Sequence, residues 1–242
     1  MLTENQQRES DQKREWIKIN HHILYEKFAG LDNFPPVEKP ITILMAGSPG
    51  AGKTEFSKNF NKEVLDYINL PLNTVRIDAD EIREIMPGYD GLNSEIFQSG
   101  ACLGVDKLYQ YALKKRQNVI IDGTFAKYDK SCDNIIRSLS KGRTVGIFYI
   151  YQEPMVAWEF TQKRAVKESR IVPVEVFVDS LFDAKENVEK AKNQFGDKII
   201  LFLIEKNYEN GVKKMFFNVD SIDNYIKIGY DKGSLLKEIQ NV

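Results

Sequence analysis

The segment GSPGAGKT at residues 47–54 has the spacing of a phosphate-binding loop, G-x-x-x-x-G-K-[ST]. It lies between an apolar run, ITILMA at residues 41–46, and a stretch with helical periodicity that begins at Thr54. Glycines in such a loop let backbone N–H groups turn around a phosphate, and the start of the helix adds a partial positive charge. Because the motif has this strand and helix around it, we predict a nucleotide-binding site here.

The loop is expected to bind ATP together with Mg2+. Lys53 would reach the β- and γ-phosphate oxygens, and the Thr54 hydroxyl would coordinate the metal ion. The predicted cofactor-binding residues are Gly47, Ser48, Pro49, Gly50, Ala51, Gly52, Lys53, Thr54 and Glu55. The chain has neither the N-K-x-D motif of GTPases nor the L-S-G-G-Q motif of transporter ATPases. A kinase for a small molecule is therefore favoured among phosphate-loop proteins.

Two carboxylates follow the next apolar run, within VRIDADEIR at residues 75–83. Asp80, near the expected start of a helix, is the candidate general base that would take the proton of the acceptor hydroxyl. Arg83, one turn later, is a candidate substrate contact. Asp78 lies two residues earlier, and either aspartate could instead be a plain helix cap. Ligands of α/β folds bind at the carboxyl ends of strands, which places these residues beside the loop.

A further acid, Asp122, ends the buried run NVIID at residues 118–122. Phosphate-loop proteins hold magnesium or its waters with a carboxylate at this position. A buried aspartate is also costly without a nearby cation or hydrogen bonds. We therefore predict that Asp122 and Thr54 form the metal site, and that Thr124 faces the same cleft.

Basic residues recur in EFTQKRAVKESR at residues 159–170, after the fourth predicted strand. Small phosphate-loop kinases carry a mobile lid at this point of the chain. Arg164 and Arg170 are candidates to contact triphosphate oxygens when the lid closes. The alternative is a solvated helix whose Lys and Glu side chains pair at i,i+4.

Apolar runs alternate with stretches of helical period along most of the chain, which predicts an α/β fold. The runs are nearly continuous, so we expect a doubly wound, mostly parallel sheet with helices on both faces. Strands are expected at residues 41–46, 74–79, 118–122, 144–151 and 198–205, followed by a hairpin turning at Asn210-Gly211 and a terminal helix over 233–242.

The first 38 residues are expected to form a helix and a linker ahead of a kinase domain at residues 39–242. Trp16, Ile19, Ile23 and Phe28 recur at spacings of three to five, as in an amphipathic helix. That helix either packs on the core of this chain or docks a partner. Prolines in residues 33–40 end it and stiffen the linker.

Composition points to a small partner. The 34 basic and 35 acidic side chains give a formal net charge of -1, so no overall field draws the chain to nucleic acid or an anionic membrane. No apolar stretch approaches the roughly 20 residues that span a bilayer, and the N-terminus lacks an apolar signal segment, so a cytoplasmic protein is expected. Cys102 and Cys132 are isolated, which fits a reducing compartment.

Taken together, GSPGAGKT, RIDADEIREIMPGYD, VIIDGT and KRAVKESRIVP resemble the zeta toxin family of bacterial toxin–antitoxin kinases in order and approximate spacing. The resemblance covers roughly residues 41–195. It implies a P-loop kinase that phosphorylates a sugar hydroxyl of UDP-N-acetylglucosamine. It also implies an antitoxin partner that blocks the nucleotide site.

The resemblance also assigns roles to single residues. Lys53 matches the lysine of the phosphate loop, Asp80 the catalytic base, and Arg164 and Arg170 the arginines that stabilise the transferring phosphoryl group. The remaining matches concern the acceptor: Thr124 corresponds to the threonine of an E-G-T motif that helps bind substrate, and Asp106 to an acidic substrate contact.

Three departures from the family pattern concern the acceptor pocket and the lid. Met86-Pro87 replaces a frequent His-Pro, Asp122 replaces the glutamate of E-G-T, and the interval from Arg164 to Arg170 is short. The resemblance as a whole still makes a nucleotide sugar the expected acceptor. Alternatives are a kinase for another nucleotide-like hydroxyl, an antibiotic or a nucleic-acid end, and a nucleotide-dependent binding or switch protein.

Overall fold

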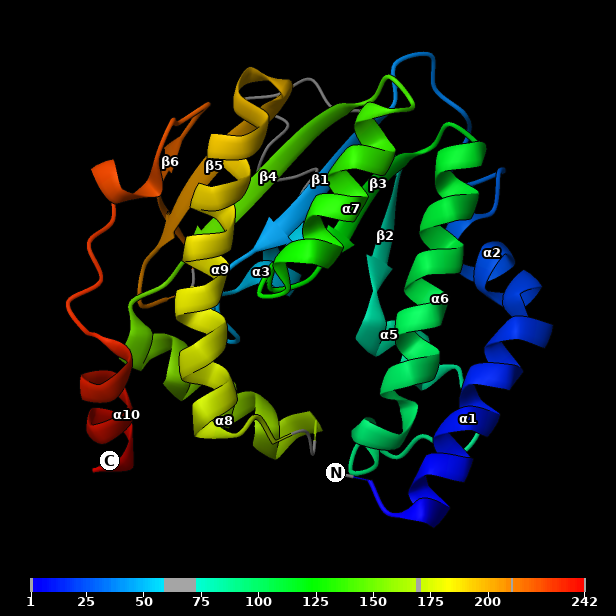
Figure 1. The fold of residues 1–242 in the computed structure, drawn as a ribbon, viewed down its shortest axis with the longest axis horizontal. Helices are drawn as coiled ribbons and strands as arrows, with labels where there is room; N and C mark the ends of the chain where they lie inside the picture. The colour runs from blue at the N-terminus through cyan, green and yellow to red at the C-terminus, as the bar shows by residue number, and fades with distance from the viewer. Residues whose placement is uncertain (1, 59–72, 169–170, 210, 242) are drawn as a thin grey trace.

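The centre of the molecule is a six-stranded sheet with the order β2-β3-β1-β4-β5-β6 (Figure 1). The structure is a computed structural model that describes residues 2–58, 73–168, 171–209 and 211–241. The strands are β1 (Ile41–Ala46), β2 (Thr74–Asp78), β3 (Asn118–Asp122), β4 (Thr144–Tyr151), β5 (Ile199–Lys206) and β6 (Val212–Phe216). The first five run parallel, and β6 is antiparallel to β5. The prediction of a doubly wound, mostly parallel α/β sheet is confirmed.

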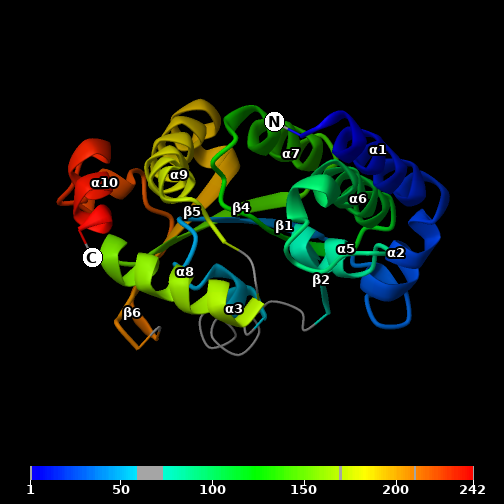
Figure 2. The same ribbon diagram turned by 90° about the horizontal axis from the view of Figure 1, so that it is seen from below.

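Helices cover both faces of this sheet. They are α1 (Glu4–Ile19), α2 (His21–Ala29), α3 (Lys53–Lys58), α5 (Ala79–Glu84), α6 (Ser94–Lys114), α7 (Tyr128–Leu139), α8 (Pro154–Glu168), α9 (Val174–Phe195) and α10 (Lys232–Gln240). Figure 2 shows α6, α7 and α9 on one side of the sheet and α3 and α8 on the other. In the part of the chain that the structure describes, no helix is long and apolar enough to cross a membrane.

Two apolar layers hold the helices to the sheet, because successive side chains of a strand point to opposite faces. In β1, Leu44 and Ala46 join the layer beneath α6 and α9, whereas Ile43 and Met45 join the layer that contains Phe56 of α3. Strands with both faces buried read as continuous apolar runs, which is why the sequence revealed them. The layers fix the ends of β1, β2 and β3 relative to one another.

The N-terminal segment forms two helices, where one had been expected. The chain breaks at Asn20, which is both the C-cap of α1 and the N-cap of α2. The break shifts the helical phase, so Ile17 and Leu24 are the fully buried side chains and Ile19 is 65% exposed. The prediction that Ile19 lies on the apolar face of one amphipathic helix was wrong for this reason. Both helices pack on this chain's own α6.

The C-terminal part of the chain follows the predicted order. β5 and β6 form the expected hairpin, in which the Asn207 N–H donates to the Gly211 carbonyl at 2.9 Å. Asn210, the predicted turn residue, lies outside the described residues. The final helix α10 begins at an Asp231 cap and packs its Leu235 and Ile239 against α8 and α9.

Candidate active site

A cavity of about 420 Å³ opens where β2 ends, between α3, α5 and α8. It is lined by Thr54, Lys58, Asp78, Asp80, Glu81, Glu84, Tyr89, Asp90, Gly91 and Arg164. The cavity lies at the carboxyl end of β2, at the edge of the sheet where α/β folds bind ligands. The cavity therefore unites the predicted phosphate loop, the predicted base and one predicted lid arginine.

The phosphate loop leaves the end of β1 and packs tightly against β4 and α8. Gly47, Gly50 and Gly52 have φ angles of 133°, 72° and 84°. A Cβ atom on Gly50 would collide with the Ala157 carbonyl of α8. The loop thus needs glycine for its backbone conformation and, at Gly50, for the close approach of α8. Glu55 is exposed in the first turn of the following helix, α3.

Lys53, the first residue of α3, is buried and folds back over the loop. Its Nζ donates to the Ser48 carbonyl at 2.5 Å. Burial lowers the pKa of the Lys53 ammonium to about 8, with Arg164 acting in the same direction and Asp122 opposing it. Within the described residues the ammonium has a carbonyl and no carboxylate at hydrogen-bond distance, which suits it to receive phosphate oxygens.

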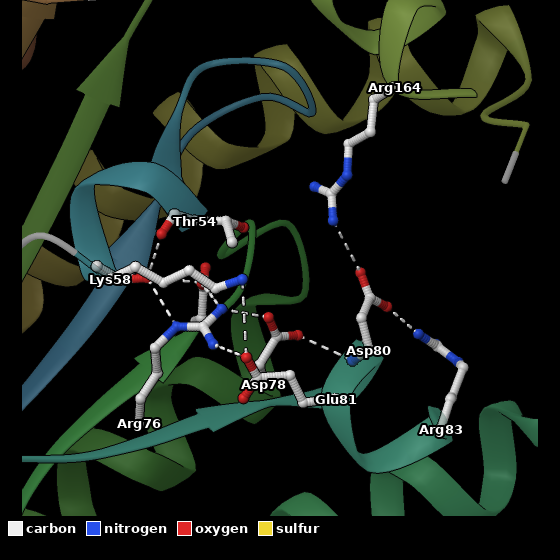
Figure 3. Close-up of polar contacts among 10 residues, drawn as sticks. Thr54, Lys58, Arg76, Asp78, Asp80, Glu81, Arg83 and Arg164 are labelled. Carbon is white, nitrogen blue, oxygen red and sulfur yellow. Dashed lines mark hydrogen bonds and ion pairs between the residues drawn. The ribbon is translucent and has the colours of Figure 1, made fainter. Parts of the chain in front are cut away.

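Asp80 lies between two arginines in the cavity (Figure 3). Arg83, one turn later in α5, donates to its Oδ1, and Nη2 of Arg164 from α8 lies 3.7 Å from its Oδ2. The Arg83 side chain is only 4% exposed and also donates to Gln98 of α6. Asp80 is therefore held at the cavity wall by its own helix and faces α8.

Asp78 is the helix cap that the sequence left undecided between two aspartates. Its carboxylate accepts a hydrogen bond of 2.8 Å from the Asp80 N–H, so α5 begins there. Burial raises the pKa of Asp78 to about 6, and the nearby Asp122 charge adds to this while Arg76 opposes it. Asp78 therefore caps α5, whereas the Asp80 side chain lines the cavity.

Arg76, which the sequence reasoning missed, joins this group of acids in the middle of β2. Its guanidinium contacts Asp78, lies 2.8 Å from Asp122 and lies 2.5 Å from Glu81. The one available signal was a lone charge between Val75 and Ile77 in a strand that precedes two acids. A charge in a covered strand has to find partners, but the sequence does not say which.

The oxygen groups at this point fit a magnesium ion. Mg2+ in phosphate-transfer sites is usually held by one or two protein oxygens together with substrate phosphates. Thr54 and Asp122 supply a hydroxyl and a carboxylate of that kind. Among the described residues, no group of three or more His, Cys, Asp or Glu side chains could hold a metal ion on its own. Thr54 and Asp122 therefore suit a magnesium ion that is bound together with the phosphates of a nucleotide.

The other predicted substrate residues lie at different distances from this cavity. The Thr124 carbonyl accepts from the Gly47 N–H at 3.1 Å, so Thr124 borders the phosphate loop. Asp106 is in α6, where it pairs with Arg137 of α7 at 2.6 Å and does not line the cavity. Arg170 lies outside the described residues. The structure therefore brings together Lys53, Asp80 and Arg164, and it leaves Asp106 on the α6–α7 surface.

Comparison with known proteins identifies the family of the chain. The sequence model of the zeta toxin family matches residues 26–218. A sequence search of curated proteins finds no significant match.

Solved structures share the fold. A chain from the PezAT chromosomal toxin–antitoxin system of Streptococcus pneumoniae has a TM-score of 0.61 at 17% identity, over 100% of this chain and 95% of that one. The AvrRxo1-ORF1:-ORF2 complex with ATP gives a TM-score of 0.65 at 13% identity, over 92% of this chain and 75% of that one. The Pnkp1/Rnl/Hen1 RNA repair complex gives 0.52 at 18% identity, over 82% and 55%. At these identities the likeness establishes the fold alone.

Proposed function

The chain belongs to the zeta toxin family, and from this premise we propose that it is a kinase that transfers the γ-phosphoryl group of ATP to a hydroxyl of a nucleotide sugar such as UDP-N-acetylglucosamine. The observation that carries the proposal is the position of Asp80, in a cavity shared by the phosphate-loop residue Thr54 and the lid-helix residue Arg164. A carboxylate opposite a phosphate loop is placed to orient an acceptor hydroxyl. The ATP bound to one structural neighbour supports the choice of nucleotide.

The proposed mechanism uses positioning and charge. The loop N–H groups and Lys53 bind the phosphates, and Thr54 and Asp122 would hold a magnesium ion that neutralises phosphate charge when it is bound. Asp80 orients the acceptor hydroxyl and takes its proton as the new O–Pγ bond forms. The bond from Pγ to the bridging oxygen breaks, and ADP leaves with that electron pair. Arg164 compensates the charge of the transferring group.

The choice of a nucleotide sugar as the acceptor rests on the family resemblance. The cavity wall carries the carboxylates of Glu81, Glu84 and Asp90, which disfavours a polynucleotide as the acceptor. The neighbour from the PezAT toxin–antitoxin system supports a protein antitoxin as the partner. We also place the protein in the cytoplasm, where both proposed substrates would occur, with the kinase domain at residues 39–242.

The test is an acceptor screen with γ-labelled ATP and Mg2+. The panel holds UDP-N-acetylglucosamine, other nucleotide sugars, a nicotinamide dinucleotide, an aminoglycoside antibiotic and a short oligonucleotide. Labelled product is expected with UDP-N-acetylglucosamine, and Asp80→Asn should abolish it. Transfer of label to another small molecule would support the kinase proposal and identify a different acceptor. Wild-type protein that binds ATP yet labels no acceptor would favour a nucleotide-dependent switch.

A further inference from the structure

Arg76 is the centre of a buried polar cluster that joins the two halves of the site. Its Nε donates to the Ser57 hydroxyl of α3 at 2.9 Å. Its other nitrogens donate to Glu81 of α5 and to Asp78 and Asp122 at the ends of β2 and β3. The side chain is 13% exposed. A single guanidinium thus connects the helix after the phosphate loop with the helix that carries Asp80.

Arg76 occupies one oxygen of each of its two neighbouring carboxylates, Asp78 and Asp122. Asp78 and Asp122 are paired in the register of β2 and β3, and one nitrogen of Arg76 lies between their Oδ2 atoms. The other oxygen of Asp78 caps α5. Oδ2 of Asp122 accepts a second hydrogen bond, of 2.8 Å, from Ser57. Within the described residues this leaves Oδ1 of Asp122 without a hydrogen bond.

Arg76 is therefore suited to set the orientation of the predicted metal carboxylate. Two hydrogen bonds on one oxygen fix the plane of a carboxylate and direct its other oxygen away from the donors. Groups in such an outer shell commonly change metal affinity by about 10- to 100-fold when they are removed. Lysine could supply a charge here, but only the planar fork of arginine reaches several acceptors in fixed directions.

We propose that Arg76 is a positioning residue that presents Oδ1 of Asp122 to the magnesium ion of Mg-ATP and, through Asp78, fixes the start of the helix that carries Asp80. This inference rests on the proposed function, because it requires that the chain binds Mg-ATP. It assigns to Arg76 a role in metal-dependent binding of the nucleotide, and it gives the residue no contact with the acceptor.

The test compares nucleotide binding with and without magnesium. The dissociation constant of a fluorescent ATP analogue is measured in Mg2+ and in EDTA, and their ratio is the magnesium gain. The variant is the double substitution Arg76→Met with Asp78→Asn, which keeps the net charge and leaves an oxygen that can cap α5. Arg14→Met is the control for the loss of an arginine away from the site, since among the described residues the hydrogen bond of the Arg14 side chain goes to Ser99 of α6, at 3.4 Å.

The double variant is expected to lose about tenfold or more of the magnesium gain, with its affinity in EDTA within about twofold of wild type. An affinity that falls equally in Mg2+ and in EDTA, or that does not fall, would overturn the proposal and make Arg76 structural.

If the double variant does not fold, Ser57→Ala removes one of the two hydrogen bonds on Oδ2 of Asp122. It should lower the gain about fivefold, as for a hydrogen bond worth about 1 kcal/mol, and an unchanged gain would contradict the proposal. If the wild-type protein binds no ATP, the result would instead contradict the proposed function.

Discussion

Arg83 donates to Oδ1 of Asp80 from the next turn of the same helix, while Arg164 of α8 lies near Oδ2 of that carboxylate. The first contact is fixed by burial and by Gln98. The second is longer, at 3.7 Å, and comes from a side chain that is 39% exposed. A triphosphate in the loop would attract Arg164 more strongly than one carboxylate does. We therefore expect Oδ2 to be the oxygen that meets the acceptor hydroxyl.

Asp80→Asn is expected to lower the rate of phosphoryl transfer by about 100-fold or more, because an amide cannot take the acceptor proton. The affinity for ATP should stay within about twofold of wild type. The measurements are the transfer rate at saturating ATP and the nucleotide dissociation constant. Asp231→Asn is the matched control, since Asp231 caps α10 and does not line the cavity, and asparagine caps equally well. Transfer that survives in Asp80→Asn would remove Asp80 as the base.

Arg83→Met should separate positioning of the base from nucleotide binding. It leaves Oδ1 of Asp80 and the Gln98 carbonyl without their buried donor, so a loss of about 1–3 kcal/mol in the free energy of unfolding is expected. The transfer rate should fall while the ATP affinity changes little. Urea unfolding and single-turnover transfer measure the two effects. An ATP affinity that falls in parallel with the transfer rate would contradict this assignment.

The sheet could be predicted from the sequence because its strands are covered on both faces. A strand such as ITILMA then has no polar side, and the phosphate loop at its end marks the edge of the sheet where ligands bind. The strand order cannot be read from the apolar pattern, because β1 pairs with β3 and β4, which lie far from it in the sequence. The break at Asn20 was missed for a similar reason, since the spacing of apolar residues continues through it.

The candidate site was predictable where spacing along one segment determines the contact. Asp80 and Arg83 are three residues apart in one helix, so their contact follows from helical geometry. The spacing could not decide whether Asp78 or Asp80 caps the helix, because both residues are common caps. Arg76 and Gln98 take their roles from other elements of the fold, and no local pattern encodes those contacts. Asp106 shows the reverse case, in which a matched distance along the chain leads to an ion pair on the surface.

Gly50→Ala is expected to destabilise the protein and to abolish ATP binding. The residue has a φ of 72°, which costs an L-residue about 1–2 kcal/mol, and the new methyl group would collide with the Ala157 carbonyl. The loop or α8 would have to shift, and the N–H groups that bind phosphate would shift with it. Gly229→Ala is the control, because a Cβ atom there meets nothing within 4 Å. Thermal unfolding and ATP titration of both variants measure the difference. Wild-type ATP affinity in Gly50→Ala would mean that the loop adapts.

The stability of the unliganded protein should depend on pH through Lys53. Its pKa in the folded state is about 8, below the ordinary value of 10.5, because the ammonium is buried. Between these two values the unfolded chain binds a proton that the folded chain has released, so folding becomes more favourable as the pH rises. The contribution is at most about 1.4 kcal/mol per pH unit over that window.

Lys53→Met provides the comparison that isolates this titration, because it removes one ammonium and leaves every other titrating group in place. Free energies of unfolding are measured in urea at pH 7, 8, 9 and 10 for both proteins. Methionine suits the buried position at all of these values, so the variant should be the more stable protein at pH 7. The difference should shrink above pH 8, as the wild-type lysine loses its charge on folding. A difference that stays constant from pH 7 to pH 10 would contradict the lowered pKa of Lys53, because it would mean that the lysine keeps its proton in the folded state.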